Sequence, residues 1–327
     1  MKIHQKNTSR GFTLIELLVA MAITTIIVTI LVSVTALSLD TWNRSRSEVR
    51  ASRQGEAMID SMARDFESLV VRKGNNFEWL SADSDPSSEG PNGNSSPNSV
   101  DLVFFSAATD RYDGQVGVDG VDLGGDVSTI AYQLRYKDPI DGDEDDDFKT
   151  FVLYRKIVNP DTTFGNAALA GTLGKTDLQA AFSTAISGSA VDDEVNFICE
   201  NIYQFTVTFH VDVTITDTSA TPATSETVSV AVPVGQQSGD QTSLFSITGS
   251  GIVTDYKPAN SDIGDDQLKS GRVTAVEISL TVLSDFGLKQ MRNRSFSDTD
   301  TDEFDEFDEF IAKNSYQFSK LIPVPGS

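Results

Sequence analysis

The sequence predicts an α+β protein in which a long N-terminal helix precedes an antiparallel β-sheet that packs on the second half of that helix. Three observations support this prediction: an uninterrupted apolar run near the N-terminus, an apolar stripe with helical spacing after it, and strand-like alternation in the rest of the 327-residue chain. A helix followed by strands is the order expected when one helix lies against an antiparallel sheet.

The apolar run extends from Phe12 to Leu39, and Glu16 is the only charged residue within it. At about 1.5 Å per residue, a helix of this length exceeds a hydrocarbon core of about 30 Å. The run therefore predicts a membrane-spanning helix. Glu16 is costly in such a helix, and an ionisable residue there indicates a partner and a role.

The helix is expected to continue beyond the membrane, because no proline occurs before Pro86. An apolar stripe follows the run at steps of three and four residues, formed by Gly55, Ile59, Met62, Phe66 and Leu69. This spacing is typical of one face of a helix. We therefore expect one helix from about Thr13 to about Val71, roughly 85–90 Å long, with its stripe packed against a sheet.

Alternating apolar residues predict strands in the remainder of the chain. The clearest lie at 203–215 and 228–234, which we expect to form a hairpin, and others are expected at 100–105, 130–136, 151–158, 276–282 and 316–324. Residues 178–186 predict a short helix. Residues 81–99, rich in Ser, Pro, Gly and Asp, predict a flexible loop. Acidic or glycine-rich connections are expected at 110–126, 139–147, 162–189 and 235–266.

The composition disfavours several classes of function. Asp and Glu number 48 against 25 Lys and Arg, which gives a formal net charge of -23. Such a surface repels phosphate backbones, so we expect no nucleic-acid partner. Cys199 is the only cysteine, which excludes an intrachain disulfide, and we expect it to be a buried apolar residue.

Catalytic constellations are also missing from the sequence. The two histidines are His4, near the N-terminus, and His210, on the polar face of a predicted strand. A catalytic triad would have to use His210, which we interpret as a solvated surface residue. The sequence contains no glycine-rich phosphate loop and no paired Cys-x-x-Cys motif. We therefore expect that the protein is not an enzyme.

Acidic runs at 141–147 and 298–309 leave two interpretations open. In the second run, Asp298, Asp300, Asp302 and Glu309 occupy positions one, three, five and twelve of a spacing that resembles a calcium-binding loop. The glycine usual at position six is replaced by Glu303, and a three-residue spacing indicates one face of a short helix for Phe304, Phe307 and Phe310. We therefore expect one of two outcomes. Either the protein binds no cofactor and both acidic runs form solvated loops, or it binds calcium.

Gly11, Phe12 and Glu16, together with the apolar segment from Leu14 to Ile23, resemble the type IV prepilin signature. In that family a short basic leader ends in Gly, prepilin peptidase cuts after this Gly, and the new N-terminus, usually Phe, is methylated. A Glu occupies the fifth mature position. The resemblance implies cleavage between Gly11 and Phe12, and an assembly role for Glu16. A secretory signal peptide instead has a shorter apolar region, followed by its cleavage site.

The resemblance also implies a domain organisation. Residues 1–11 would be the leader, 12–39 the transmembrane and assembly helix, 40–80 the periplasmic part of the stem with the start of the globular domain, and 81–327 a β-rich domain with acidic loops. Lys2, Lys6 and Arg10 would hold the leader on the cytoplasmic side. Their removal would change the formal net charge from -23 to -26. The expected location is the bacterial inner membrane, crossed once, with a periplasmic globular domain.

The function implied is that of a structural subunit in a type IV pilus-like or type II secretion pseudopilus fibre. Its partners would be the prepilin peptidase and N-methylase, other pilin or pseudopilin subunits, and the inner membrane. The chain length, the element order and residues 272–278 resemble the J-type minor pseudopilins. Two alternatives remain: a membrane-anchored binding module displayed through a prepilin leader, and a minor pilin for adhesion or DNA uptake.

Overall fold

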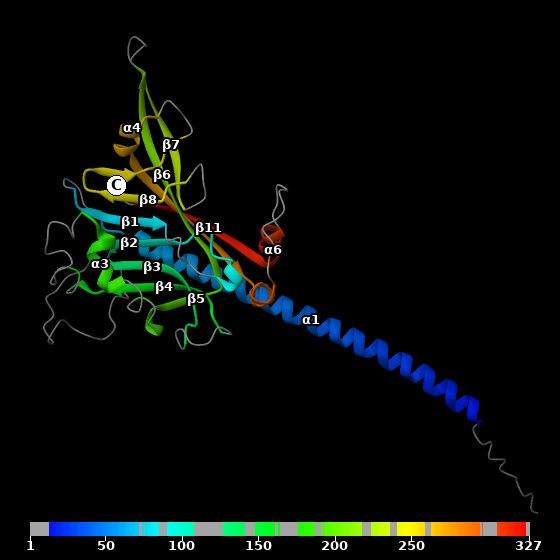
Figure 1. Cartoon of the computed structure of the whole chain (residues 1–327). Helices are drawn as coiled ribbons and strands as arrows, with labels where there is room; N and C mark the ends of the chain where they lie inside the picture. The colour runs from blue at the N-terminus through cyan, green and yellow to red at the C-terminus, as the bar shows by residue number, and fades with distance from the viewer. Residues whose placement is uncertain are drawn as a thin grey trace, which may run out of the picture. The chain divides into compact units, whose positions relative to one another are not determined.

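The computed structural model describes residues 13–71, 74, 76–84, 90–107, 127–140, 148–160, 163, 176–186, 191, 193–217, 224–235, 241–258, 263–294, 296 and 306–324. The chain divides into two compact units, residues 1–49 and 50–327. Helix α1 spans Leu14–Glu67, and its residues from Arg50 onward belong to the second unit. Antiparallel sheets follow this long N-terminal helix (Figure 1), which confirms the predicted α+β class.

The second unit contains two antiparallel sheets. The seven-stranded sheet has the order β5-β4-β3-β2-β1-β8-β9, and the four-stranded sheet has the order β11-β10-β6-β7 (Figure 1). The strand bounds are β1 Glu78–Ser84, β2 Val100–Ser106, β3 Ser128–Lys137, β4 Thr150–Val158, β5 Phe197–Glu200, β6 Ile202–Asp217, β7 Thr224–Val234, β8 Leu244–Thr248, β9 Gly251–Thr254, β10 Arg272–Leu283 and β11 Ser315–Pro323.

Four further α-helices and two short 3-10 helices connect these strands within the described residues. They are α3 Leu178–Ile186, α4 Asp265–Lys269, α5 Asp285–Asn293, α6 Glu306–Asn314, η1 Pro91–Gly93 and η4 Glu194–Asn196. Helix α3 confirms the short helix predicted at these residues. It lies against β2, where the rings of Phe105 and Phe182 meet edge to face at 6.4 Å between centroids.

Three expectations differ from the structure. The connection expected at 235–266 is wrong for β8 and β9, which form strands there because β8 pairs with β1 and β9 pairs with β8. Helix α1 ends at Glu67 rather than near Val71, because the chain turns to pair with β2, and the Val70 N–H donates to the Phe105 carbonyl at 2.9 Å. The loop expected from residue 81 is wrong for Ser81–Ser84, which form the second half of β1. β1 pairs with both β2 and β8, so pairing on two sides outweighs a turn-forming composition.

The apolar stripe of α1 is packed as predicted. Ile59, Met62 and Phe66 are buried on α1, as is Leu69 just after the helix, and the Phe66 ring stacks on Phe104 of β2 with 4.6 Å between centroids. Gly55 faces the other sheet, where a Cβ atom at this position would lie 2.4 Å from the Phe318 ring of β11. The second unit therefore packs its part of α1 against residues of both sheets.

A buried charge network joins α1 to the seven-stranded sheet. Arg155 of β4 donates two hydrogen bonds to Asp65 of α1, each 2.7 Å long, and the Tyr132 hydroxyl of β3 also donates to Asp65. Asp65 is only 4% exposed. Burial raises the pKa of Tyr132 well above its usual range, so its hydroxyl remains a proton donor. A two-point Arg–carboxylate contact fixes geometry as well as charge, and this one sets the position of Asp65 against β3 and β4.

Candidate processing and assembly site

The described part of the chain begins with reciprocal hydrogen bonds between Thr13 and Glu16. Glu16 Oε2 accepts from the Thr13 backbone N–H at 2.9 Å and from its hydroxyl at 2.8 Å, while Thr13 Oγ1 accepts from the Glu16 N–H at 3.4 Å. This arrangement is a capping box, which satisfies N–H groups left open at the start of a helix. Glu16 therefore caps the N-terminus of α1 in addition to placing a carboxylate in the apolar run.

The site residues predicted from the sequence include Glu16 but not Thr13. The sequence does contain a signal for Thr13, because Thr-x-x-Glu at the start of an apolar run is the spacing of a capping box. Both hydrogen bonds to the Glu16 carboxylate end on Oε2. Among the described residues, Oε1 accepts no hydrogen bond, so this oxygen is available to a group outside them.

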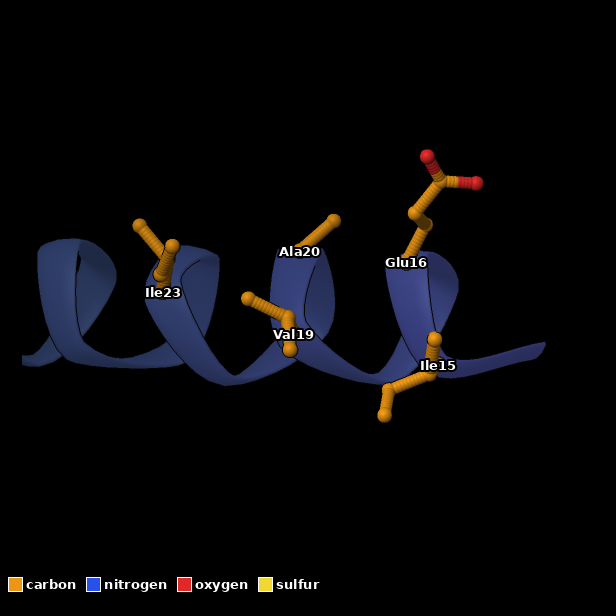
Figure 2. A pocket seen from close by; sticks show the side chains of 5 residues that line it. All are labelled: Ile15, Glu16, Val19, Ala20 and Ile23. Carbon is orange, nitrogen blue, oxygen red and sulfur yellow. The ribbon is translucent and has the colours of Figure 1, made fainter. Parts of the chain in front are cut away.

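Glu16 lies on one face of α1 with small and apolar neighbours. Figure 2 shows Glu16, Ala20 and Ile23 extending from the same side of the helix, as their spacing of four and three residues requires, while Ile15 points away. A shallow depression in the helix surface is lined by Ile15, Glu16, Val19, Ala20 and Ile23. The methyl side chain of Ala20 leaves room beside the carboxylate for another helix.

The N-terminal part of α1 exposes an almost entirely apolar surface. Its most apolar window has a mean hydropathy of 2.7, and α1 is the only helix among the described residues that is long and apolar enough to cross a membrane. Its hydroxyl side chains are satisfied internally, because each donates to the carbonyl four residues earlier: Thr24, Thr25, Thr29, Ser33, Thr35, Ser38 and Thr41. This surface can therefore be buried in lipid or against other helices without unpaired hydroxyl groups.

The other predicted site residues are only partly covered by the structure. Gly11 and Phe12 lie outside the described residues, and so do Asp298, Asp300 and Asp302. Glu309 lies in α6, where it forms an ion pair with Lys313. In the part of the chain that the structure describes, no group of three or more His, Cys, Asp or Glu residues could hold a metal ion. Calcium binding stays a prediction.

Cys199 occupies the buried environment expected from the sequence, whereas His210 is not the solvated residue expected there, because its Nε2 atom is buried. Cys199 is 4% exposed, and burial raises the pKa of its thiol to about 12, which suppresses the reactive thiolate. His210 is partly exposed on β6, with Nε2 3.5 Å from Glu277 Oε2 of β10. Among the residues that the structure describes, neither side chain is grouped with others in a constellation that would support nucleophilic catalysis.

Residues 6–32 match the model of the prokaryotic N-terminal methylation motif. The match includes Gly11, Phe12 and Glu16 and extends into the apolar part of α1, so the chain carries a prepilin-like signature. No curated protein and no solved structure matches the chain. The signature and the membrane-competent helix together support membrane anchoring and a pilin-like or pseudopilin-like role.

Proposed function

We propose that this chain is a structural subunit of a type IV pilus-like or type II secretion pseudopilus fibre, and that it is a minor pseudopilin. The methylation motif at residues 6–32 is the observation that carries the proposal, because it joins a processing site to a membrane-competent helix. The order of a long helix followed by antiparallel sheets agrees with this role. The second unit would supply the domain displayed on the outside of the fibre.

In this proposal, processing precedes assembly. Prepilin peptidase cleaves between Gly11 and Phe12, and the new N-terminus at Phe12 is methylated. The mature chain stays in the inner membrane through the apolar part of α1, with its second unit in the periplasm. It then joins other pilin or pseudopilin subunits, whose helices replace lipid around the apolar surface of α1.

Glu16 pairs with the methylated amino group of Phe12, either in its own subunit or in a neighbouring one. The geometry supports different roles for the two oxygens of its carboxylate. Oε2 caps the helix through Thr13, whereas Oε1 accepts no hydrogen bond from a described residue and can accept one from the amino group. An ammonium group and a carboxylate that meet in the fibre core avoid the cost of burying either charge alone. Ala20, one turn from Glu16 on the same side, allows the neighbouring helix to approach (Figure 2).

A pair of variants tests this mechanism. Glu16→Gln keeps an oxygen acceptor for Thr13 but removes the charge, so we expect normal cleavage and about a tenfold loss of the chain from the sheared fibre fraction, equivalent to about 1.4 kcal/mol. The control Thr13→Val removes the hydroxyl half of the cap while keeping the charge, and we expect a smaller loss. Normal incorporation of Glu16→Gln would contradict the pairing mechanism.

Gly11→Leu tests the processing step separately. A bulky residue at the junction should block cleavage and leave the full-length chain in the membrane, which immunoblotting of membrane and fibre fractions would show. Co-purification of the wild-type chain with other prepilin-like subunits would support assembly over solitary display. Cleavage without any such subunits would favour a membrane-anchored display module.

A further inference from the structure

Strand β7 forms one edge of the four-stranded sheet. It pairs with β6 over eleven residue pairs, from Val207–Val234 to Asp217–Thr224, without a register shift. Figure 1 shows the two strands as a long hairpin. Because the pairing is regular, the opposite edge of β7 presents backbone groups at a regular spacing.

Two hydrogen bonds at the end of β7 show which residues face that edge. Thr242 N–H donates to the Pro233 carbonyl at 3.0 Å, and Gly235 N–H donates to the Thr242 carbonyl at 2.9 Å. Pro233 and Gly235 therefore direct their backbone groups away from β6. Since successive residues of a strand alternate in direction, Thr227, Ser229 and Ala231 also direct their N–H and carbonyl groups outward.

The outward edge is open over these three residues. Thr227, Ser229 and Ala231 are exposed, and within the described residues no hydrogen bond reaches their outward backbone groups. Their side chains are small, so another backbone can approach to the usual strand separation of about 4.8 Å.

The other described sheet edges carry features that discourage strand pairing. β5 and β9 have four residues each, and a register shift interrupts the pairing of β5 with β4. β11 contains Lys320, paired with Asp60 of α1, and ends at Pro323. Short strands, bulges, lysine and proline protect natural sheet edges. β7 has none of these between Thr227 and Ala231.

We propose that the β7 edge from Thr227 to Ala231 binds an extended strand of a different, net-basic polypeptide by β-strand addition. The backbone groups supply the hydrogen bonds. On the other face of β7, Val228 is only partly buried and offers an apolar contact to alternate side chains of the added strand. Exposed Glu226 and the formal charge of -23 favour Lys or Arg in the partner and oppose pairing with a second copy.

The test uses the full chain in lipid nanodiscs and a synthetic probe that does not depend on fibre assembly. The probe is an acetylated and amidated octapeptide in which Val and Thr alternate between terminal Lys residues. We expect saturating probe to slow amide hydrogen exchange at Thr227, Ser229 and Ala231 by about tenfold, because added strand pairing protects their outward N–H groups. Unchanged exchange at millimolar probe would overturn the proposal.

A matched pair of variants tests the edge itself. Ser229→Pro removes an outward N–H that the β6 ladder does not use, so the variant should keep its melting temperature and bind the probe about tenfold more weakly. Ser229→Ala keeps the N–H and should bind like the wild type. Equal binding by Ser229→Pro and Ser229→Ala would overturn the proposal.

Two further measurements on the wild-type chain test the proposal without relying on Ser229→Pro. A probe N-methylated at alternate amides, on the edge that faces β7, should not protect the wild-type chain, and protection by this probe would count against backbone pairing. Protection that appears without probe and grows with protein concentration would assign the edge to a second copy and overturn the choice of partner.

Discussion

At the residue scale, Asp65 shows how one buried carboxylate ties the helix to the sheet. Asp65→Ala would remove the carboxylate that accepts two hydrogen bonds from Arg155, and loss of one member of a buried ion pair typically costs about 3–5 kcal/mol of unfolding free energy. Urea unfolding followed by Trp79 fluorescence measures this loss, since Trp79 is 2% exposed in the core. The control Asp60→Ala breaks an exposed pair with Lys320 and should change stability little. Equal effects of the two variants would contradict a special role for the buried network.

The partly buried carboxyl group of Glu78 should make the stability of the fold depend on pH. Burial raises the pKa of Glu78 above its ordinary 4.5, and nearby Asp177 acts in the same direction, although Glu78 accepts a 2.7 Å hydrogen bond from the Leu178 N–H. The folded state therefore binds this proton more tightly than the unfolded state. The ionised carboxylate lowers stability above its folded pKa, and this cost disappears as the pH falls below about 4.5.

Glu78→Gln should consequently be more stable than the wild type at neutral pH, because the amide oxygen can still accept from Leu178. The advantage should shrink as the pH falls through the raised pKa of Glu78 toward 4.5. Melting temperatures of both proteins across this range measure the difference. A variant that is less stable at neutral pH would show that the charge itself favours the capped end of α3.

At the element scale, Gly55 sets how closely α1 approaches β11. Gly55→Leu should lower the unfolding free energy by about 1–3 kcal/mol, because the new side chain meets the Phe318 ring. This loss opposes the gain of up to about 1 kcal/mol expected when Gly is replaced inside a helix. Glu56→Leu on the exposed side of α1 is the control and should lack the packing cost. A stabilised Gly55→Leu variant would mean that the helix moves away from β11 freely.

Element boundaries show where local sequence patterns stop being sufficient. Residues 203–215 and 228–234 alternate strictly, and the predicted hairpin is confirmed by β6 and β7. Ser81–Ser84 lack such a pattern and lie in a turn-rich stretch, yet they form a strand because β2 and β8 flank it. Alternation reveals a strand with one exposed face, whereas residues 79–82 of β1 are buried in succession, and a strand buried on both faces needs no alternation.

At the scale of the whole molecule, the second unit should fold without the first. The hydrophobic core of buried residues lies between Ala51 and Val324, entirely within residues 50–327. We expect the fragment 50–327 to unfold cooperatively in a thermal scan. The control fragment 72–327 lacks Met62 and Phe66, which fill the core between helix and sheet, and should not show a cooperative transition. Similar transitions in both fragments would contradict a structural role for α1 in the second unit.

The sequence alone predicts the long helix, its membrane-competent half, the strands with clear alternation and the N-terminal processing signature. Each of these features depends on residues that are close together along the chain. Over such short distances, the periodicity and spacing of apolar residues indicate which face of an element is buried. The three-dimensional fold was needed to show that the strands divide into two sheets, that Asp65 meets Arg155 across 90 residues, and that Thr227, Ser229 and Ala231 face an open edge. Periodicity reports that a face is buried but not against which partner, and that choice depends on packing between distant segments.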